Sequence, residues 1–223
     1  MITAIFLHLE SDQYNSIVIN YLNQIVDPFN LYITHNKNEV LKDYNRFTPA
    51  VFKIHERGRD IGAFLRTIDY WQKKGNNEEV IFKIKVPNKM EKNFLPERYL
   101  ELAIGDIIEK WDKIMSVFKT DTVIGCFGSG TLYENNVINY ESLINEYFEN
   151  FNLLRRVTGH FLGDTFIAKS KPINTFFKNN NPISILSDFE FDPPMFSKID
   201  AFRKIWYAIF RNEGLEVRDA KNL

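Results

Sequence analysis

Short apolar runs alternate with helical patterns over about the first 90 residues, and this alternation limits the folds open to the chain. Between the runs, apolar residues recur every three or four positions, as in amphipathic helices. Strands separated by helices pair in parallel, because a parallel crossover needs a connection of about a dozen residues. We therefore predict an α/β fold: a mostly parallel, doubly wound sheet with helices on both faces. The predicted strands of this half are Ile2–His8, Leu31–Thr34, Ala50–Ile54 and Val80–Val86.

The second half of the chain is less regular but continues the mixed pattern. It predicts a fifth strand at Thr122–Cys126 and a sixth, of either direction, at Phe161–Ala168. The charged tail 213–223 is expected to fray. No composition break divides the 223 residues, so we predict a single domain with halves at 1–90 and 91–212. The predicted helices of the second half cover residues 97–118, 139–154 and 196–210.

Charge, cysteine content and hydropathy exclude several classes of protein. The net charge is -1 with both signs interspersed, which argues against sequence-independent nucleic-acid binding. The single cysteine, Cys126, lies in an apolar run, so neither a disulfide framework nor a zinc site is expected. No apolar run approaches ~20 residues, and the amino-terminus lacks the length and charge of a signal peptide. We expect a soluble, cytoplasmic protein without a transmembrane segment.

The turn after the third predicted strand gathers charged residues at the start of a helix. In α/β sheets, ligands bind at the carboxyl ends of strands, beside the amino-termini of helices. The guanidinium groups of Arg57 and Arg59 supply the charge and the bidentate geometry that a diphosphate needs. A structural alternative makes Asp60 a helix cap, Gly58 a turn residue and the arginines solvated.

Arg57–Gly62 also resembles a family signature, asparagine-arginine-glycine-arginine-aspartate-isoleucine-glycine, with Glu56 in place of the asparagine. The signature is that of the rhamnan synthesis protein F family, glycosyltransferases of bacterial and viral surface polysaccharides. The chain resembles this family from His8 to about Trp206, and the arginine turn is the most specific part of the resemblance.

Weaker matches keep the order of the family's segments. His8 closes the first strand, and Phe82–Lys85 resembles a leucine-lysine-apolar-histidine segment. Phe161–Phe166 resembles a phenylalanine-alanine-glycine-threonine-methionine-phenylalanine strand, in which Asp164 replaces the threonine. The last helix departs from the family, because Asp200–Lys204 stands where the family has histidine-alanine-x-glutamate-arginine.

The resemblance implies a GT-A fold and the transfer of a sugar, rhamnose or an N-acetylhexosamine. The donor would be a UDP- or dTDP-linked sugar and the acceptor a glycan hydroxyl. Residues 1–90 would bind the nucleotide sugar and residues 91–212 the acceptor, in the host cytoplasm if the protein is viral. The implied donor-binding residues are His8, Arg57, Gly58, Arg59, Asp60, Lys83 and Lys85.

Many GT-A enzymes neutralise the leaving diphosphate with a metal held by an Asp-x-Asp motif after the fourth strand. This chain has Lys83, Lys85 and Lys89 in that region and no carboxylate pair. A lysine ammonium can neutralise a leaving phosphate, so we predict metal-independent transfer that depends on Lys83 and Lys85. Two alternatives remain: manganese or magnesium bound through phosphate oxygens, and lysines that only cover one face of the sheet.

Transfer also needs a base that takes the proton of the acceptor hydroxyl. The candidates are Asp164, Asp192 and Asp200, together with Glu190. Asp164 stands out because an acid inside an apolar strand is costly unless it is paired or functional; the alternative is a strand edge that faces water. Asp192 lies in a loop, where acids are usually solvated. The missing Asp-x-Asp motif leaves a second function open, a non-catalytic nucleotide-sugar- or glycan-binding domain.

Overall fold

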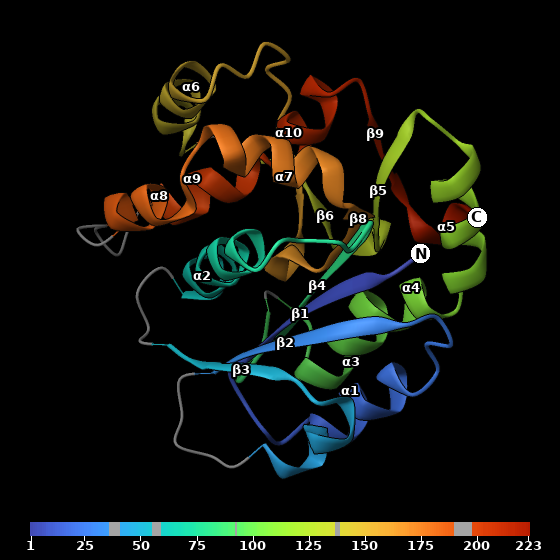
Figure 1. Cartoon of the computed structure of the whole chain (residues 1–223). Helices are drawn as coiled ribbons and strands as arrows, with labels where there is room; N and C mark the ends of the chain where they lie inside the picture. Colours follow the sequence, from blue (N-terminus) through green and yellow to red (C-terminus); the bar gives the residue numbers. More distant parts are fainter. Residues whose placement is uncertain (36–40, 55–58, 92, 137–138, 190–197) are drawn as a thin grey trace.

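In the part of the chain that the structure describes, seven strands form one sheet through the middle of the molecule (Figure 1). The computed structural model describes residues 1–35, 41–54, 59–91, 93–136, 139–189 and 198–223. In sheet order, the strands are β3 (Ala50–Lys53), β2 (Phe29–His35), β1 (Thr3–Leu9), β4 (Val80–Val86), β8 (Phe166–Lys169), β5 (Ile124–Gly128) and β9 (Glu216–Asp219). Neighbouring strands pair in parallel except β8, which runs antiparallel to β4 and β5. The prediction of a mostly parallel α/β sheet is therefore confirmed.

Helices cover both faces of this sheet (Figure 1). Phe6 of β1 packs in the core on one face, while Ile5 and Leu7 pack on the other, because successive side chains of a strand point in opposite directions. The face of Phe6 carries α2 (Arg59–Lys73), α6 (Glu141–Asn150), α7 (Ser170–Asn179), α8 (Pro182–Asp188), α9 (Lys198–Lys204) and α10 (Trp206–Asn212); the other carries α1 (Asn15–Leu22), α3 (Pro96–Leu100), α4 (Asp106–Ile108) and α5 (Trp111–Thr120).

None of the helices in the described part of the chain is long and apolar enough to cross a membrane.

The structure corrects two expectations about the second half of the chain. Phe161–Ala168 is not one strand, because β7 (His160–Phe161) ends in a 3-10 turn that separates it from β8. Asp164 closes this turn with a φ of 52°, a left-handed conformation that aspartate adopts more readily than most residues. The charged tail does not fray, because β9 pairs in parallel with β5 at the edge of the sheet. A small antiparallel ladder joins β7 to β6 (Tyr133–Glu134).

Helix α8 was not predicted, although its first residues carry a helix-start signal. The Asn181 side chain accepts hydrogen bonds from the backbone N–H groups of Ile183, at 2.8 Å, and Ser184, at 3.1 Å. Pro182 follows at the first helical position, where its missing N–H and fixed φ are tolerated. The helix predicted over 97–118 is divided into α3, a π-helical segment, α4 and α5, with the π-helical segment ending at Gly105.

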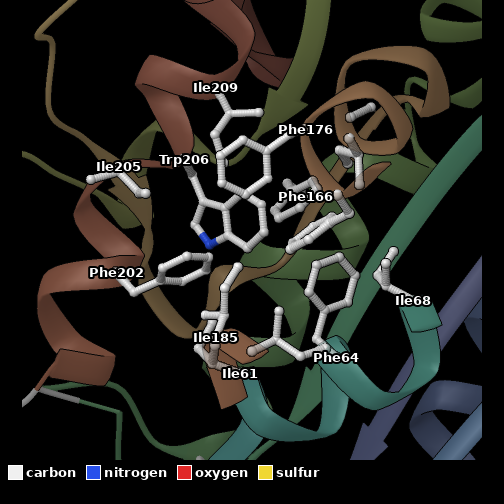
Figure 2. Packing of buried hydrophobic residues seen from close by; sticks show 14 of the residues in the cluster. Ile61, Phe64, Ile68, Phe166, Phe176, Ile185, Phe202, Ile205, Trp206 and Ile209 are labelled. Atoms are coloured by element: carbon white, nitrogen blue, oxygen red, sulfur yellow. The ribbon is translucent and has the colours of Figure 1, made fainter. Parts of the chain in front are cut away.

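An aromatic core joins α2 to the C-terminal helices (Figure 2). Phe64 of α2 meets Trp206 of α10 with ring centroids 5.5 Å apart, and Phe202 of α9 meets the same indole at 5.6 Å. Asp60 lies directly before the buried Ile61, and Arg203 lies directly after Phe202. Packing of this core therefore brings the first turn of α2 and the last turn of α9 together at one end of the sheet.

Glu78 stabilises the opposite end of the sheet, where β4 begins. Its Oε1 accepts hydrogen bonds from Asn30 Nδ2 at 2.7 Å and from the Tyr32 hydroxyl at 2.9 Å. Its Oε2 accepts from Trp71 Nε1 at 2.8 Å. Burial alone would raise the pKa of Glu78, but the bonds from Asn30, Trp71 and Tyr32 outweigh burial and lower it. This carboxylate thus connects β2 and the end of α2 to the start of β4.

We predict that Glu78→Gln lowers the free energy of unfolding at pH 7 by ~1–3 kcal/mol, since an amide cannot accept all these bonds. A lowered folded-state pKa stabilises the fold above the pKa of an unfolded glutamate, ~4.3, and this stabilisation is lost as the pH falls through the folded value. Urea unfolding at several pH values checks both points, with the exposed neighbour variant Glu79→Gln as control. The prediction is wrong if the two variants are equally stable.

Candidate functional site

A pocket of about 560 Å³ lies at the carboxyl ends of β1 and β4. From β1, the chain builds the sheet outward through β2 to β3 and then returns to place β4 on the other side of β1. Such a reversal of strand order opens a crevice at the carboxyl ends of the strands, where α/β proteins bind their ligands. The described residues that line it are His8, Glu10, Ile54, Arg59, Asp60, Lys85, Asn88, Lys89, Glu91 and Arg203.

Arg203 lines the pocket and forms the centre of a network of charged side chains. Its guanidinium donates to three carboxylates: to Asp60 through Nη2, to Asp164 through Nε at 2.9 Å, and to Asp200 through Nη1 at 2.6 Å. Burial alone would lower the pKa of Arg203, but the three carboxylates raise it further above its usual value. One side chain of α9 therefore holds the start of α2 and the turn before β8.

Lys83 extends the network from β4. Its ammonium lies 3.6 Å from Asp60 Oδ2 and 4.0 Å from Asp164 Oδ2, and it donates to the Asp164 carbonyl at 3.1 Å. Lys83 is 2% exposed, Asp60 1% and Asp164 0%, so these charges are shielded from water. Buried ions remain charged only when they are paired in this way.

The two buried aspartates differ in their protonation equilibria. Burial would raise the pKa of Asp60, but Arg203, Lys85 and Lys83 lower it below the usual value. Burial raises the pKa of Asp164 to about 6, because Lys83 and Arg203 only partly oppose the effect. Asp164 Oδ1 is buried without a hydrogen bond from any residue that the structure describes. Carboxylates whose environments separate their pKa values are typical of functional sites, and also of structural ion-pair networks.

Lys85 lies opposite His8 in the β1–β4 ladder and reaches into the pocket. Its ammonium contacts Glu91 and lies 3.5 Å from Glu10 Oε1. Burial would lower the pKa of Lys85, but Asp60, Glu91 and Glu10 raise it. Burial raises the pKa of Glu10, and the charge of Lys85 opposes that shift. The pocket therefore contains an ammonium that already has carboxylate partners.

Arg59 occupies the pocket edge at the start of α2. Its φ of 50° is left-handed, and its side chain is half exposed, 3.7 Å from Asp200. A non-glycine residue in this conformation is strained and persists only where its surroundings fix it. The side chain thus lies beside the pocket, and Asp200 is the one carboxylate within 4 Å of it among the described residues.

The structure brings together most of the predicted site residues that it describes. Those that line the pocket are His8, Arg59, Asp60 and Lys85. Lys83, Asp164 and Asp200 lie around the pocket residue Arg203 without lining the pocket. The alternative of Asp164 at a strand edge facing water is wrong, since it is fully buried. Arg57, Gly58, Asp192 and Glu190 lie outside the described residues.

The sequence did not identify Arg203, Glu10 and Glu91 as parts of the site. Arg203 had a signal, because it is a charged residue beside Phe202 on the apolar side of an amphipathic helix. Glu10 and Glu91 follow the ends of β1 and β4 and gave no motif. Their role depends on Lys85, which lies between them.

A divalent ion finds no prepared site in the described ranges, since no three His, Cys, Asp or Glu side chains there are arranged to ligate one. The cationic groups Lys83 and Arg203 lie among the aspartates instead. Metal independence stays a prediction.

Comparisons with known proteins leave the site to be interpreted from its own geometry. The sequence matches no protein-family model and no curated protein.

We predict that Asp164 makes stability depend on pH near neutrality. Because its folded pKa is raised to about 6, the folded protein takes up a proton at a higher pH than the unfolded chain. From this group the free energy of unfolding should rise by on the order of 1 kcal/mol as the pH falls from 7 to 5. Asp164→Asn should remove that rise, as measured by urea unfolding at both pH values. Parallel pH profiles for the two proteins would contradict the assignment.

Proposed function

We propose that the protein is a GT-A-type glycosyltransferase, which moves a sugar from a nucleoside diphosphate in this pocket to a glycan hydroxyl. The observation that carries the proposal is the position and chemistry of the pocket. It lies where the strand order reverses and combines cations with carboxylates. The resemblance of the arginine turn to the rhamnan synthesis protein F signature points the same way. The donor in this proposal is a UDP- or dTDP-linked rhamnose or N-acetylhexosamine.

The two halves of the reaction need different groups from the pocket. The leaving diphosphate needs positive charge, for which Arg59 and Lys89 are available in the lining, and Lys85 offsets the charges of Glu10 and Glu91 there. The acceptor hydroxyl needs a base, and Glu10 is a candidate because it lines the pocket and burial raises its pKa. Asp164 acts in this proposal by holding Arg203 and Lys83, since it has no exposed surface.

The second candidate function is a nucleotide-sugar- or glycan-binding domain without catalysis. The observation in its favour is that Asp164 and Asp200 do not line the pocket, and that their carboxylates are bound by Arg203. Both functions place their ligand, a nucleotide sugar or a glycan, in the same pocket. Donor hydrolysis or transfer, measured on the purified protein with both classes of donor, separates them.

Arg59→Ala should weaken binding of UDP or dTDP by ~1–3 kcal/mol, because a charge-assisted hydrogen bond to phosphate is lost. Isothermal titration calorimetry measures the change. Arg98→Ala is a matched control, because Arg98 is an exposed arginine of α3 paired with Glu101 and away from the pocket lining. An unchanged dissociation constant in folded Arg59→Ala would assign the arginine turn a structural role.

Turnover should persist in the presence of a chelator and fall in Lys85→Ala. Without the lysine, Glu10 and Glu91 would face the diphosphate with their charge uncompensated. Lys83→Ala should also reduce turnover, through the positions of Asp60 and Asp164, and should lower stability as well. If the chelator abolishes transfer and manganese restores it, the metal-independent mechanism is wrong.

A further inference from the structure

The two ring nitrogens of His8 have different environments at the carboxyl end of β1. Nδ1 lies 3.1 Å from Thr34 Oγ1, and the Thr34 hydroxyl donates to the Leu7 carbonyl at 3.4 Å. A hydroxyl has a single proton, so Thr34 accepts from His8 while it donates to Leu7. In the neutral ring, Nδ1 therefore carries the proton and Nε2 carries the lone pair.

The lone pair on Nε2 is available to a ligand. Burial lowers the pKa of His8 to about 4, so the imidazole is neutral at physiological pH. The ring lines the pocket, and Nε2 has no hydrogen-bond partner among the residues that the structure describes. The fold thus presents a fixed hydrogen-bond acceptor, without charge, on the pocket wall.

The cations of the pocket fall into two groups. Lys85 and Arg203 are each bound by more than one carboxylate. Arg59 has only Asp200 at 3.7 Å, and the exposed Lys89 forms no ion pair within the described ranges. Among the residues that the structure describes, Arg59 and Lys89 are therefore the pocket cations with the fewest carboxylate partners, which makes these two side chains the better phosphate ligands.

The polarity of the pocket lining limits which chemical groups of a ligand it can bind. Among the described lining residues, Ile54 is the one aliphatic side chain, and no Phe, Tyr or Trp offers a stacking surface. A nucleotide base in the pocket therefore finds no aromatic ring to stack on among these described residues. Hydroxyl groups donate to acceptors such as a neutral histidine nitrogen, and they fit this lining.

We propose that His8 Nε2 accepts a hydrogen bond from a sugar-ring hydroxyl while Arg59 and Lys89 hold the adjoining phosphate. This inference rests on the proposed function, because it assumes that a nucleotide or nucleotide sugar enters the pocket. The hydroxyl belongs to the transferred sugar or to the nucleotide ribose. Thr34 is a positioning residue, because it fixes the tautomer without lining the pocket.

Isothermal titration calorimetry on the wild type, His8→Phe and Lys89→Ala tests whether His8 binds the hydroxyl and Lys89 binds the phosphate. His8→Phe should weaken binding of at least one of UDP, UDP-N-acetylglucosamine and dTDP-rhamnose roughly 3- to 10-fold, the effect of one neutral hydrogen bond. The affinity for pyrophosphate, which has no sugar hydroxyl, should stay within about twofold. Lys89→Ala should weaken the binding of these nucleotides and of pyrophosphate by roughly tenfold or more. The proposal is overturned if His8→Phe changes the binding of none of these nucleotides, or changes pyrophosphate binding as much as nucleotide binding.

The choice of ligands identifies the hydroxyl. A His8 effect on UDP but not on 2′-deoxy-UDP assigns the contact to the ribose. An effect on UDP-N-acetylglucosamine or dTDP-rhamnose, but not on UDP or dTDP, assigns it to the transferred sugar. Both results support an acceptor at Nε2, and they differ only in the ring that it contacts.

Thr34→Val tests the positioning role, since valine has the shape of threonine but cannot accept from Nδ1. Nitrogen-15 NMR of the His8 ring should show the Nδ1–H tautomer in the wild type and a mixture in Thr34→Val, with a 3- to 10-fold affinity loss like that of His8→Phe. His35→Phe is the matched control, because His35 is a buried histidine at the end of β2 outside the pocket lining. A Thr34→Val protein with wild-type affinity would overturn the positioning role.

Failure of the proposed function gives a different result. If the wild type binds no nucleotide, the glycosyltransferase proposal fails, and the hydroxyl contact is then tested with free L-rhamnose and N-acetylglucosamine. A shift of the His8 Nε2 resonance with either sugar, absent in Thr34→Val, supports the contact. If no sugar or nucleotide sugar shifts that resonance, the contact is overturned as well.

Discussion

The arrangement of the site depends on the ion pairs of the Arg203 guanidinium. The guanidinium binds carboxylates from the start of α2, the turn before β8 and its own helix α9. Removing one partner from a buried ion network typically costs 3–5 kcal/mol, because the remaining charges have no water to solvate them. Arg59 and Asp164, which both have a left-handed backbone, contact this network. Buried ion pairs and aromatic packing together hold two residues with strained backbone conformations near one pocket.

The two ends of the sheet differ in whether their charged side chains are fully paired. At the amino end of β4, Glu78 has donors for both carboxylate oxygens and serves stability. At the carboxyl end, buried charges are paired while Arg59 and Lys89 at the pocket remain exposed. His8 adds a neutral acceptor between these groups. The pocket at the carboxyl end therefore combines exposed cations with a neutral acceptor.

Much of the fold could be predicted because its signals are local. Continuous apolar runs identified β1 and β4, and the arginine turn marked the start of α2. Prediction was wrong where pairing partners are distant, as in β9, whose charged sequence becomes a strand only beside β5. It was also wrong at Asp164, which the apolar pattern placed in a strand. Its left-handed turn is maintained by contacts with Arg203 and Lys83, far away in the sequence.

The sequence by itself determined the class of fold and placed several polar residues at the carboxyl end of the sheet, where the pocket lies. These follow from periodicity and from the direction of parallel strands, which are properties of short segments. Only the tertiary structure decided the role of each charge. Lys83 and Lys85 lie two residues apart on β4, so their side chains leave the strand on the same face. Lys83 is nevertheless buried between Asp60 and Asp164, while Lys85 reaches the pocket. The free energy of a buried charge depends on its partners and its exposure to water, and both are set by the packing of distant helices.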